Sequence, residues 1–276
     1  MYTKKLAIIG SGNMAVALIK GLLKSNIISP ENIMSTDINE DRLKKLEKEY
    51  SVRISSDNKK AVEWADVVLL AIKPQILKNV LIEVKNEIKD KLIVSIVAAI
   101  ATEEIEKILG DKQKVIRVMP NVAVSVMEGT SVVCYGKYIT KEDSSFVSEL
   151  FKGVGMVREI KEDIMDAVTA LSGTGPMYVF LTIEALTDAG INVGLSREDA
   201  LPLSIQTVFG SSKMVMECDE DPESLKSLVT SPGGTSISAL HSLEKAGIKK
   251  MFKDAIEAAT NRAAEIRRTI HEKNSE

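Results

Sequence analysis

The chain has 276 residues, of which 45% are hydrophobic and 27% are charged, and its formal net charge is −3. This composition is typical of a globular protein with one large or two medium domains. The charges are interspersed and form no basic face that would indicate a nucleic-acid partner, and the two cysteines and two histidines have no metal-type spacing, so we expect neither nucleic acid nor a metal site.

Targeting and membrane signals are not found in the sequence. Met1 to Lys5 lead directly into a strand-like segment, so we identify no signal peptide. The longest apolar runs, 65–72 and 92–101, are too short and too interrupted to span a bilayer. Because low cysteine usage also fits a reducing compartment, we expect a cytoplasmic protein without a membrane partner.

The first motif is a glycine-rich loop near the N-terminus. The apolar run Leu6–Ile9 predicts a buried parallel strand, and it leads into Gly10-Ser11-Gly12-Asn13-Met14-Ala15, a G-x-G-x-x-A loop followed by a helical pattern. Gly10 permits the tight turn, Gly12 lets a pyrophosphate approach the backbone, and Ala15 is small enough for helix-on-strand contact. The loop predicts dinucleotide binding; the alternative is a glycine-rich turn without a ligand.

Asp37 follows the second expected strand, 32–36, near the position of the acidic residue that holds the adenosine ribose. A carboxylate there favours a free 2′-hydroxyl and repels a 2′-phosphate, and the next arginine, Arg42, comes only a turn later. Asp37 therefore favours NADH slightly over NADPH as the cofactor. It could also cap the helix expected at 40–50.

Strands and helices continue to alternate through the first half of the chain. The alternation predicts a doubly wound, mainly parallel α/β sheet of the Rossmann type. Further strands are expected at 52–54, 67–72, 92–97 and 114–118, helices at 57–64, 76–88 and from Thr102, which would cap its own helix, and two added strands at 130–135 and 156–160 around a helix at 140–151.

Ligands bind at the carboxyl ends of parallel strands in such sheets. Small or polar residues lie at several of the expected strand ends, and their convergence predicts the cofactor site. These residues are Gly10, Gly12, Ala71, Lys73, Ala98 and Asn121. For Lys73, which precedes a proline, a solvated loop lysine is the alternative.

The strand signals stop after Lys161, and helices are expected at 163–171, 177–189, 197–216, 222–229, 237–246 and 248–270. We therefore predict two domains, a dinucleotide-binding domain over 1–160 and an all-helical domain over 161–276. The helix at 177–189 is apolar nearly all round and must be buried on most sides. We infer burial against another subunit, hence a homodimer or larger oligomer; the alternative is burial by the N-terminal domain.

A bare turn lies between two of these helical patterns, at Ser231-Pro232-Gly233-Gly234-Thr235-Ser236. The proline fixes its own φ, and the two glycines permit unusual backbone angles and bring no side chain. The helix that follows begins with N–H groups that lack intrahelical partners, so the turn is a candidate anion site with two hydroxyls beside it. A simple turn with an N-cap is the competing interpretation.

These motifs together resemble those of the pyrroline-5-carboxylate reductases over essentially the whole chain. The matching motifs are Gly10 to Ala15, Ala71-Ile72-Lys73-Pro74, Met119-Pro120-Asn121, Leu171 to Pro176 with Tyr178, Glu184-Ala185-Leu186, Asp188-Ala189-Gly190, Gln206-Thr207, and Ser231 to Thr235 with Leu243-Glu244. The first three also occur in other Rossmann oxidoreductases, whereas the later set in this order is highly specific. The resemblance implies NAD(P)H-dependent reduction of 1-pyrroline-5-carboxylate to L-proline, the last step of proline biosynthesis, by dimers that often assemble further.

The resemblance also implies the site residues. Cofactor contacts fall at Ile9, Gly10, Ser11, Gly12, Asn13, Met14, Asp37, Asn58, Ala71, Ile72, Lys73, Pro74 and Ala98. Substrate contacts fall at Glu162, Gly233, Gly234, Thr235 and Ser236, with the Ser236 hydroxyl as the catalytic group at the ring nitrogen. For Glu162, a surface carboxylate is the alternative interpretation.

Three positions depart from the family's usual pattern. The family commonly has threonine at Ser236, alanine-alanine-glycine at Val97-Ala98-Ala99, and a polar residue at Leu228. Two other activities stay open: reduction of a related cyclic imine, and 3-hydroxyacid dehydrogenation. The latter depends on a lysine and an asparagine on a C-terminal helix, and here Lys213 has no matching asparagine a turn later.

Overall fold

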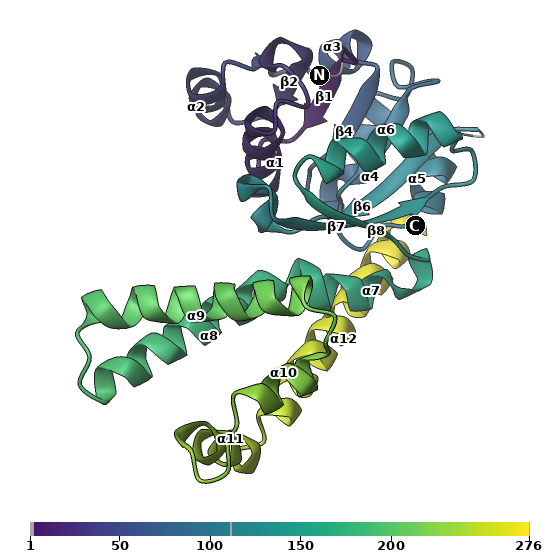
Figure 1. The fold of residues 1–276 in the computed structure, drawn as a ribbon. Helices are drawn as coiled ribbons and strands as arrows, with labels where there is room; N and C mark the ends of the chain where they lie inside the picture. The colour runs from purple at the N-terminus through teal and green to yellow at the C-terminus, as the bar shows by residue number, and fades with distance from the viewer. Residues whose placement is uncertain (1–2, 111, 276) are drawn as a thin grey trace. The chain divides into compact units, whose positions relative to one another are not determined.

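The structure, a computed structural model, describes residues 3–110 and 112–275; Met1 and Tyr2, considered above, lie outside them (Figure 1). The chain divides into two compact units. One contains the residues up to Thr174 together with those from Ala259 on, and the other is Gly175–Ala258. The boundary predicted after residue 160 was placed where strands give way to helices, and it stays a prediction. The two compact units of the structure meet in the sequence between Thr174 and Gly175.

The first unit is built on one eight-stranded sheet of order β3-β2-β1-β4-β5-β6-β7-β8. Its strands are β1 (Leu6–Ile9), β2 (Ile33–Thr36), β3 (Arg53–Ser55), β4 (Val67–Leu70), β5 (Leu92–Ser95), β6 (Lys114–Met119), β7 (Gly129–Tyr135) and β8 (Gly155–Glu159). Strands β1 to β6 are parallel, β7 is antiparallel to β6, and β8 is parallel to β7. The predicted doubly wound sheet with two added strands is confirmed, and the strand order reverses beside β1, where such sheets bind ligands.

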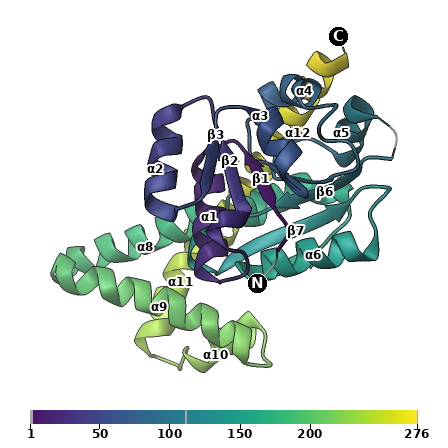
Figure 2. The same ribbon diagram turned by 90° about the horizontal axis from the view of Figure 1, so that it is seen from above.

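Helices cover both faces of this sheet (Figures 1 and 2). The helices α1 (Asn13–Lys24), α2 (Glu40–Tyr50) and α6 (Lys141–Lys152) contribute to one hydrophobic cluster, and α3 (Asn58–Trp64), α4 (Pro74–Glu83) and α5 (Thr102–Leu109) contribute to the other. Successive side chains of a strand point to opposite faces, so Ile8 belongs to the first cluster and Ile9 to the second.

Several predicted elements have different boundaries in the structure, and two of the differences concern helices of the first unit. Helix α4 begins at Pro74 and ends at Glu83, rather than spanning 76–88, because proline suits the first position of a helix, where its missing N–H is not needed. The helix predicted at 163–171 is three short segments: a 3-10 turn at Glu162–Ile164, α7 (Met165–Val168), and a π-helical turn at Thr169–Gly173.

The π-helical turn contains one widely spaced backbone hydrogen bond. The Thr174 amide donates to the carbonyl of Thr169 at 2.9 Å, so this bond spans five residues. The hydroxyls of Thr169 and Ser172 donate back to the carbonyls of Met165 and Val168, and such hydroxyls compete with regular helical bonding. The segment that precedes the second unit is therefore wound differently from an ordinary α-helix.

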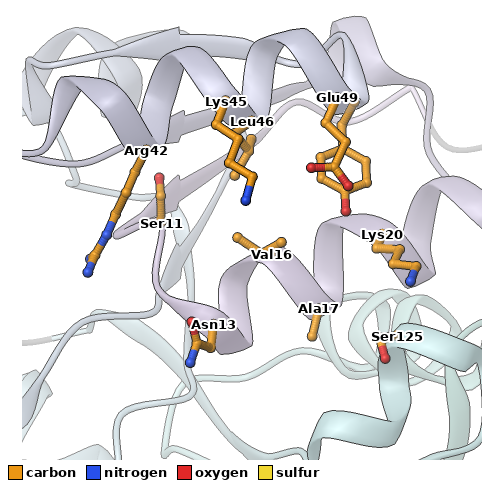
Figure 3. A pocket seen from close by; sticks show the side chains of 11 residues that line it. Ser11, Asn13, Val16, Ala17, Lys20, Arg42, Lys45, Leu46, Glu49 and Ser125 are labelled. Carbon is orange, nitrogen blue, oxygen red and sulfur yellow. The ribbon is translucent and has the colours of Figure 1, made fainter.

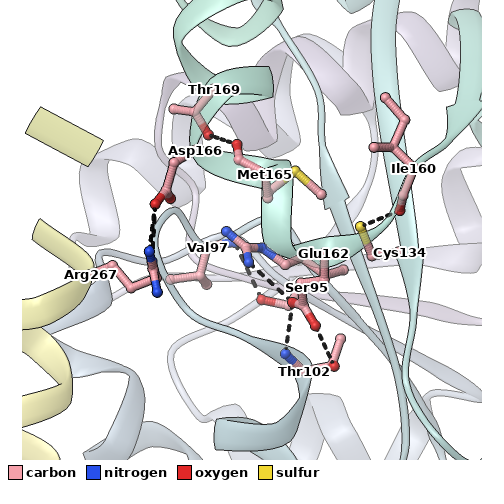
Figure 4. Close-up of polar contacts among 11 residues, drawn as sticks. Ser95, Val97, Thr102, Cys134, Ile160, Glu162, Met165, Asp166, Thr169 and Arg267 are labelled. Carbon is pink, nitrogen blue, oxygen red and sulfur yellow. Dashed lines mark hydrogen bonds and ion pairs between the residues drawn. The ribbon is translucent and has the colours of Figure 1, made fainter. Parts of the chain in front are cut away.

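The end of α12 (Ile248–Ser275) belongs to the first unit. Ile266 and Ile270 pack against the cluster that includes α4 and α5. Arg267 donates to the Asp166 carboxylate at 3.0 Å, which adds an ion pair with α7 (Figure 4). The last part of the chain thus completes the core of the unit that the first part begins.

The second unit contains α8 (Gly175–Asn192), α9 (Arg197–Glu217), α10 (Pro222–Leu228), α11 (Thr235–Lys245) and the first part of α12. Its predicted helices are confirmed. Helix α9 is capped by Ser196, whose hydroxyl accepts from the Asp199 amide at 3.1 Å, and α10 is capped by Asp221. Within residues 3–110 and 112–275, none of the helices has the length and apolar character needed to cross a bilayer.

The two cysteines provide a test of the fold. Cys134, on β7, is 3% exposed and donates to the Ile160 carbonyl at 3.0 Å, while Cys218 is exposed. Burial, with the nearby Glu162 charge, raises the pKa of the Cys134 thiol to about 11. Because the thiolate is the reactive form, we expect iodoacetamide at neutral pH to label Cys218 and not Cys134 in the native chain, and both after denaturation. Peptide mass mapping measures this, and equal native labelling of both would contradict the burial of β7.

Candidate active site

Gly10 is the tight turn that the motif predicts. It has a φ of +99°, and its amide donates to the Thr36 carbonyl at 2.9 Å. A Cβ on Gly10 would lie 2.6 Å from the carbonyl oxygen of Ala71. Only glycine fits here, because both the backbone angle and the space exclude a side chain. The turn thus brings the end of β1 directly against the segment that follows β4.

The start of α1 is open and uncapped. Gly12 is its N-cap residue, no side chain caps it, and its first turn contains no acidic residue. A Cβ on Gly12 would meet nothing within 4 Å, so space is free beside the backbone. The first N–H groups of a helix lack intrahelical partners and attract anions. The loop from Gly10 to Met14 therefore fits the pyrophosphate of a dinucleotide.

Asp37 is bound to the same loop. Its carboxylate accepts from the Ser11 amide and from the Asn39 amide, both at 2.9 Å. The interpretation of Asp37 as the cap of α2 is wrong, because the Asn39 side chain accepts from the Arg42 amide at 3.1 Å and holds that position. The Arg42 guanidinium lies 4.0 Å from the Asp37 carboxylate. This corner therefore presents both a negative and a positive group.

A cavity of about 480 Å³ lies between α1 and α2 beside this corner. Figure 3 shows Arg42, Lys45 and Glu49 extending from one helix toward the helix that carries Asn13, Val16 and Ala17. Ser11 and Arg42 line this cavity as well as contacting Asp37. Lys20 also lines the cavity, so its charged lining residues are the basic Lys20, Arg42 and Lys45 and the acidic Glu49.

Other predicted cofactor residues lie at the starts of α3 and α4. The side-chain oxygen of Asn58 accepts from the Thr36 hydroxyl at 2.6 Å, and its amide nitrogen lies 3.3 Å from the Glu83 carboxylate. The Ala71 amide donates to the Ile9 carbonyl at 2.9 Å, and Lys73, which is exposed, is the N-cap residue of α4. The segment from Ala71 to Pro74 thus lies beside the glycine loop, as the motif predicts.

The loop after β5 contains Ala98 and a strained neighbour. Ala99 has a φ of +65° and is 6% exposed. This left-handed conformation is unfavourable for any residue with a Cβ, and the family commonly has glycine at this position. Ala99 thus adopts a conformation that glycine would adopt without strain.

Glu162 lies in a network inside the first unit (Figure 4). One carboxylate oxygen accepts from the Thr102 amide at 3.0 Å and from the Arg117 guanidinium at 3.1 Å, and the other accepts from the Thr102 hydroxyl at 2.8 Å. The Arg117 side chain is 3% exposed and that of Glu162 is 25% exposed. Glu162 is therefore a fixed, partly buried carboxylate rather than a free surface charge.

Two residues of this network were missed or misread in the sequence. Thr102 does not cap α5, because Ala101 is the N-cap residue and the Thr102 hydroxyl donates to Glu162. Arg117 was not identified, although a charged residue within the apolar strand Lys114–Met119 is a signal for a buried ion pair. Its partner could not be identified from the sequence, because Glu162 comes from a distant segment.

Asn121 has a structural role in this arrangement. Its side-chain oxygen accepts from the amides of Ala123 and Thr130, at 3.2 Å and 3.3 Å, and its nitrogen donates to the Ser172 carbonyl at 3.1 Å. The residue is 8% exposed. Asn121 thus connects the end of β6 with the π-helical turn, and its amide group is already engaged.

The bare turn of the second unit has the predicted geometry. Gly233 has a φ of +73°, and Gly234 is the N-cap residue of α11 without a side-chain cap. A Cβ on Gly234 would lie 2.6 Å from the Ser231 hydroxyl oxygen. Helix α11 begins at Thr235 rather than at the predicted 237, so Thr235 and Ser236 belong to its first turn. Leu228, where the family commonly has a polar residue, is 70% exposed.

Two family models match the chain in succession. Residues 5–99 match "NADP oxidoreductase coenzyme F420-dependent", and residues 162–266 match "Pyrroline-5-carboxylate reductase dimerisation". With the Rossmann sheet and the open glycine loop, this match defines the class: an NAD(P)-dependent oxidoreductase. Within residues 3–110 and 112–275, no group of three or more histidine, cysteine, aspartate or glutamate residues could hold a metal ion.

Full-length relatives identify the family. The chain is 43% identical to the pyrroline-5-carboxylate reductase of Methanosarcina acetivorans, covering 96% of this chain and 99% of that protein. It is 38% identical to the Arabidopsis thaliana protein of the same name, covering 95% of each. A Plasmodium falciparum pyrroline carboxylate reductase, solved with NADP bound, superimposes with a TM-score of 0.90 at 36% identity, covering 97% of this chain and 99% of that one. The chain belongs to the pyrroline-5-carboxylate reductase family.

A more distant structure shows the fold alone. Prephenate dehydrogenase from A. aeolicus superimposes with a TM-score of 0.53 at 17% identity, covering 96% of this chain and 99% of that one. The architecture is therefore shared with oxidoreductases that act on other substrates, and the reaction has to be argued from the site.

The strained Ala99 gives a stability prediction. Replacing Ala99 by glycine removes a left-handed penalty but adds freedom to the unfolded chain, so we expect a net gain of about 0.5–1 kcal/mol. Melting temperature should rise by about 1–4 °C, measured by calorimetry. Ala98→Gly is the matched control, because Ala98 lies outside the left-handed region and should gain nothing. A lower melting temperature for Ala99→Gly would contradict the strain.

Proposed function

We propose that the chain reduces 1-pyrroline-5-carboxylate to L-proline with NAD(P)H, and that the bare turn Gly233-Gly234-Thr235 binds the substrate carboxylate. The uncapped start of α11 is the observation that carries this proposal, because it offers free backbone N–H groups at a helix N-terminus. The full-length relatives named pyrroline-5-carboxylate reductase support the choice of substrate.

Ser236, in the first turn of α11, is proposed to hydrogen-bond the ring nitrogen of the substrate. The imine is more electrophilic when protonated, and its nitrogen can take that proton from water, so the protein needs little acid–base chemistry. A bound nicotinamide dinucleotide supplies the hydride that reduces the C=N bond. Positioning the two reactants accounts for most of the acceleration and can supply roughly 7–11 kcal/mol.

Glu162 is proposed to bind the substrate as a fixed anion. An ionised carboxylate has about four acceptor positions, and Thr102 and Arg117 occupy three of them. The remaining position, on the oxygen that accepts from the Thr102 hydroxyl, can accept from the single N–H of the protonated ring, which it then shares with the Ser236 hydroxyl. Glu162 then favours the protonated, more reactive form of the imine through its charge.

The cofactor is proposed to contact the loop from Ile9 to Met14, Asn58, the segment from Ala71 to Pro74, and Ala98. A preference for NADH is the finer part of this proposal, and it rests on the Asp37 carboxylate, which repels a 2′-phosphate. The adjacent Arg42 opposes this effect, because a guanidinium attracts phosphate. The two groups together make the preference a small one.

The helical unit is proposed to form a homodimer or a dimer-based oligomer. Large apolar side chains on α8 and α9 are exposed in the single chain, among them Phe180 at 62%, Leu203 at 57% and Phe209 at 59%. Large exposed apolar side chains gathered on two neighbouring helices are typical of an interface. We also propose a cytoplasmic location, because the free cysteines, one buried and one exposed, suit a reducing compartment.

Assays with different substrates distinguish pyrroline-5-carboxylate reduction from the two alternative activities. Oxidation of NADH and of NADPH is followed with pyrroline-5-carboxylate, with the six-membered piperideine-6-carboxylate, and with a 3-hydroxyacid in the reverse direction. The proposal predicts the highest kcat/KM with pyrroline-5-carboxylate. Higher efficiency with the six-membered imine would favour a related cyclic imine reductase, and turnover of the hydroxyacid alone would overturn the proposal.

Ser236→Ala tests the catalytic hydroxyl. The variant loses one hydrogen bond of about 1.5–3 kcal/mol to a charged ring nitrogen, so kcat should fall about tenfold to a hundredfold. Ser238→Ala, in the same turn, is the control, because the Ser238 hydroxyl donates only to the Gly234 carbonyl. Ser236→Thr should retain activity. Unchanged kinetics for Ser236→Ala would remove this residue from the site.

Asp37→Ser tests the ribose assignment. The substitution removes the charge that repels a 2′-phosphate and leaves Arg42 in place, so the ratio of kcat/KM for NADPH to that for NADH should rise. Steady-state kinetics with each cofactor measures the ratio. Arg42→Met is the opposing variant and should lower the ratio. A ratio that does not change in Asp37→Ser would exclude Asp37 from cofactor choice.

A further inference from the structure

Arg117 is a buried cation in the middle of the sheet. It lies on β6, opposite Ser95 on β5 and Cys134 on β7. Its side chain is 3% exposed. Burying a charge is costly unless it is paired, so the position of Arg117 requires an explanation.

The ion pair with Glu162 engages only one of the two terminal nitrogens of the guanidinium. One terminal nitrogen of Arg117 lies 3.1 Å from the Glu162 carboxylate. The other terminal nitrogen is buried and has no hydrogen-bond partner in the part of the chain that the structure describes. Apolar residues of similar volume often replace a buried ion pair without loss of stability, and an unpaired buried donor is unfavourable. Stability of the fold alone therefore does not account for Arg117.

The contacts of Glu162 connect this ion pair to the proposed site. The same carboxylate binds both the amide and the hydroxyl of Thr102, at the start of α5. The segment directly before α5 contains Ala98, a proposed cofactor contact, and the strained Ala99. Arg117 and Thr102 make three contacts with Glu162, and this restraint leaves one acceptor position of the carboxylate in a set direction.

We infer that Arg117 is a positioning residue of this reductase, which acts through Glu162 and sets the direction in which that carboxylate accepts from the substrate. The inference rests on the proposed role of Glu162. Arg117 itself donates to Glu162 and does not touch the substrate. Without Arg117, Glu162 keeps its two Thr102 contacts but loses the third, so the carboxylate is held less firmly in this direction.

Kinetics of Arg117→Met, Arg117→Lys and Glu162→Gln, and of the double variant Arg117→Met/Glu162→Gln, test this inference. Lys114→Met is the matched control, because Lys114 lies on the same strand and pairs with Asp143 instead, at 2.8 Å. Each variant is measured for kcat, for KM of the imine, for KM of the cofactor and for melting temperature. A purely structural role changes the melting temperature and the active fraction, whereas a positioning role changes KM of the imine.

We expect the Arg117 variants to change KM for the imine and not KM for the cofactor. Arg117→Met should raise KM for the imine about tenfold to a hundredfold, the range for one charged hydrogen bond, with KM for the cofactor unchanged. Arg117→Lys should restore most of the loss, and Lys114→Met should change neither KM. The double variant should match Glu162→Gln, because the charged carboxylate through which Arg117 acts is already absent.

If the wild-type chain is active, any of three results would overturn the inference about Arg117 and leave the proposed function intact. They are an unchanged imine KM in Arg117→Met, no rescue by lysine, and effects of the two single variants that multiply in the double variant. If Arg117→Met does not fold, the double variant, which carries neither charge, is compared with Glu162→Gln, and a different KM overturns the inference. A wild-type chain without turnover would overturn the proposed function and this inference with it.

Discussion

Helices α1 and α11 each have a glycine as the N-cap residue, which provides no side-chain cap, and the proposed site depends on the N–H groups that these starts leave free. Helix α1 begins after Gly12 and α11 after Gly234. Other helices, such as α2, α6 and α9, are capped by Asn39, Thr140 and Ser196. The uncapped starts are the ones suited to anions, because a capping side chain would occupy the same N–H groups. One start suits a dinucleotide pyrophosphate and the other a small carboxylate.

A third helix start is held by a carboxylate of the chain itself. The first amide of α5 donates to Glu162, which also binds Arg117 inside the sheet. The same physical interaction, an anion at a helix N-terminus, thus recurs with an internal partner. In this way a residue beyond β8 is connected to the loop after β5 and to the middle of β6. Such a connection gives a carboxylate a fixed direction, which a surface glutamate would lack.

The sheet was predictable because its strands are short apolar runs that alternate with helical patterns, so all eight were identified within a few residues. Some boundaries differed from the prediction. Helix α4 begins at Pro74, and the segment predicted as one helix over 163–171 includes a π-helical turn. At the candidate site, the glycine loop and the turn before α11 have the predicted conformations, because glycine and proline restrict the backbone locally.

The sequence by itself determined the fold class, the family and the two bare turns, since all of these depend on residues close together in the chain. Only the tertiary structure decided which side chains share a contact. It showed that Asn39 and not Asp37 caps α2, that Ser11 donates to Asp37, and that Thr102, Arg117 and Glu162 form one network. These partners are far apart in sequence, and only the packing of parallel strands and their crossovers brings them within hydrogen-bonding distance.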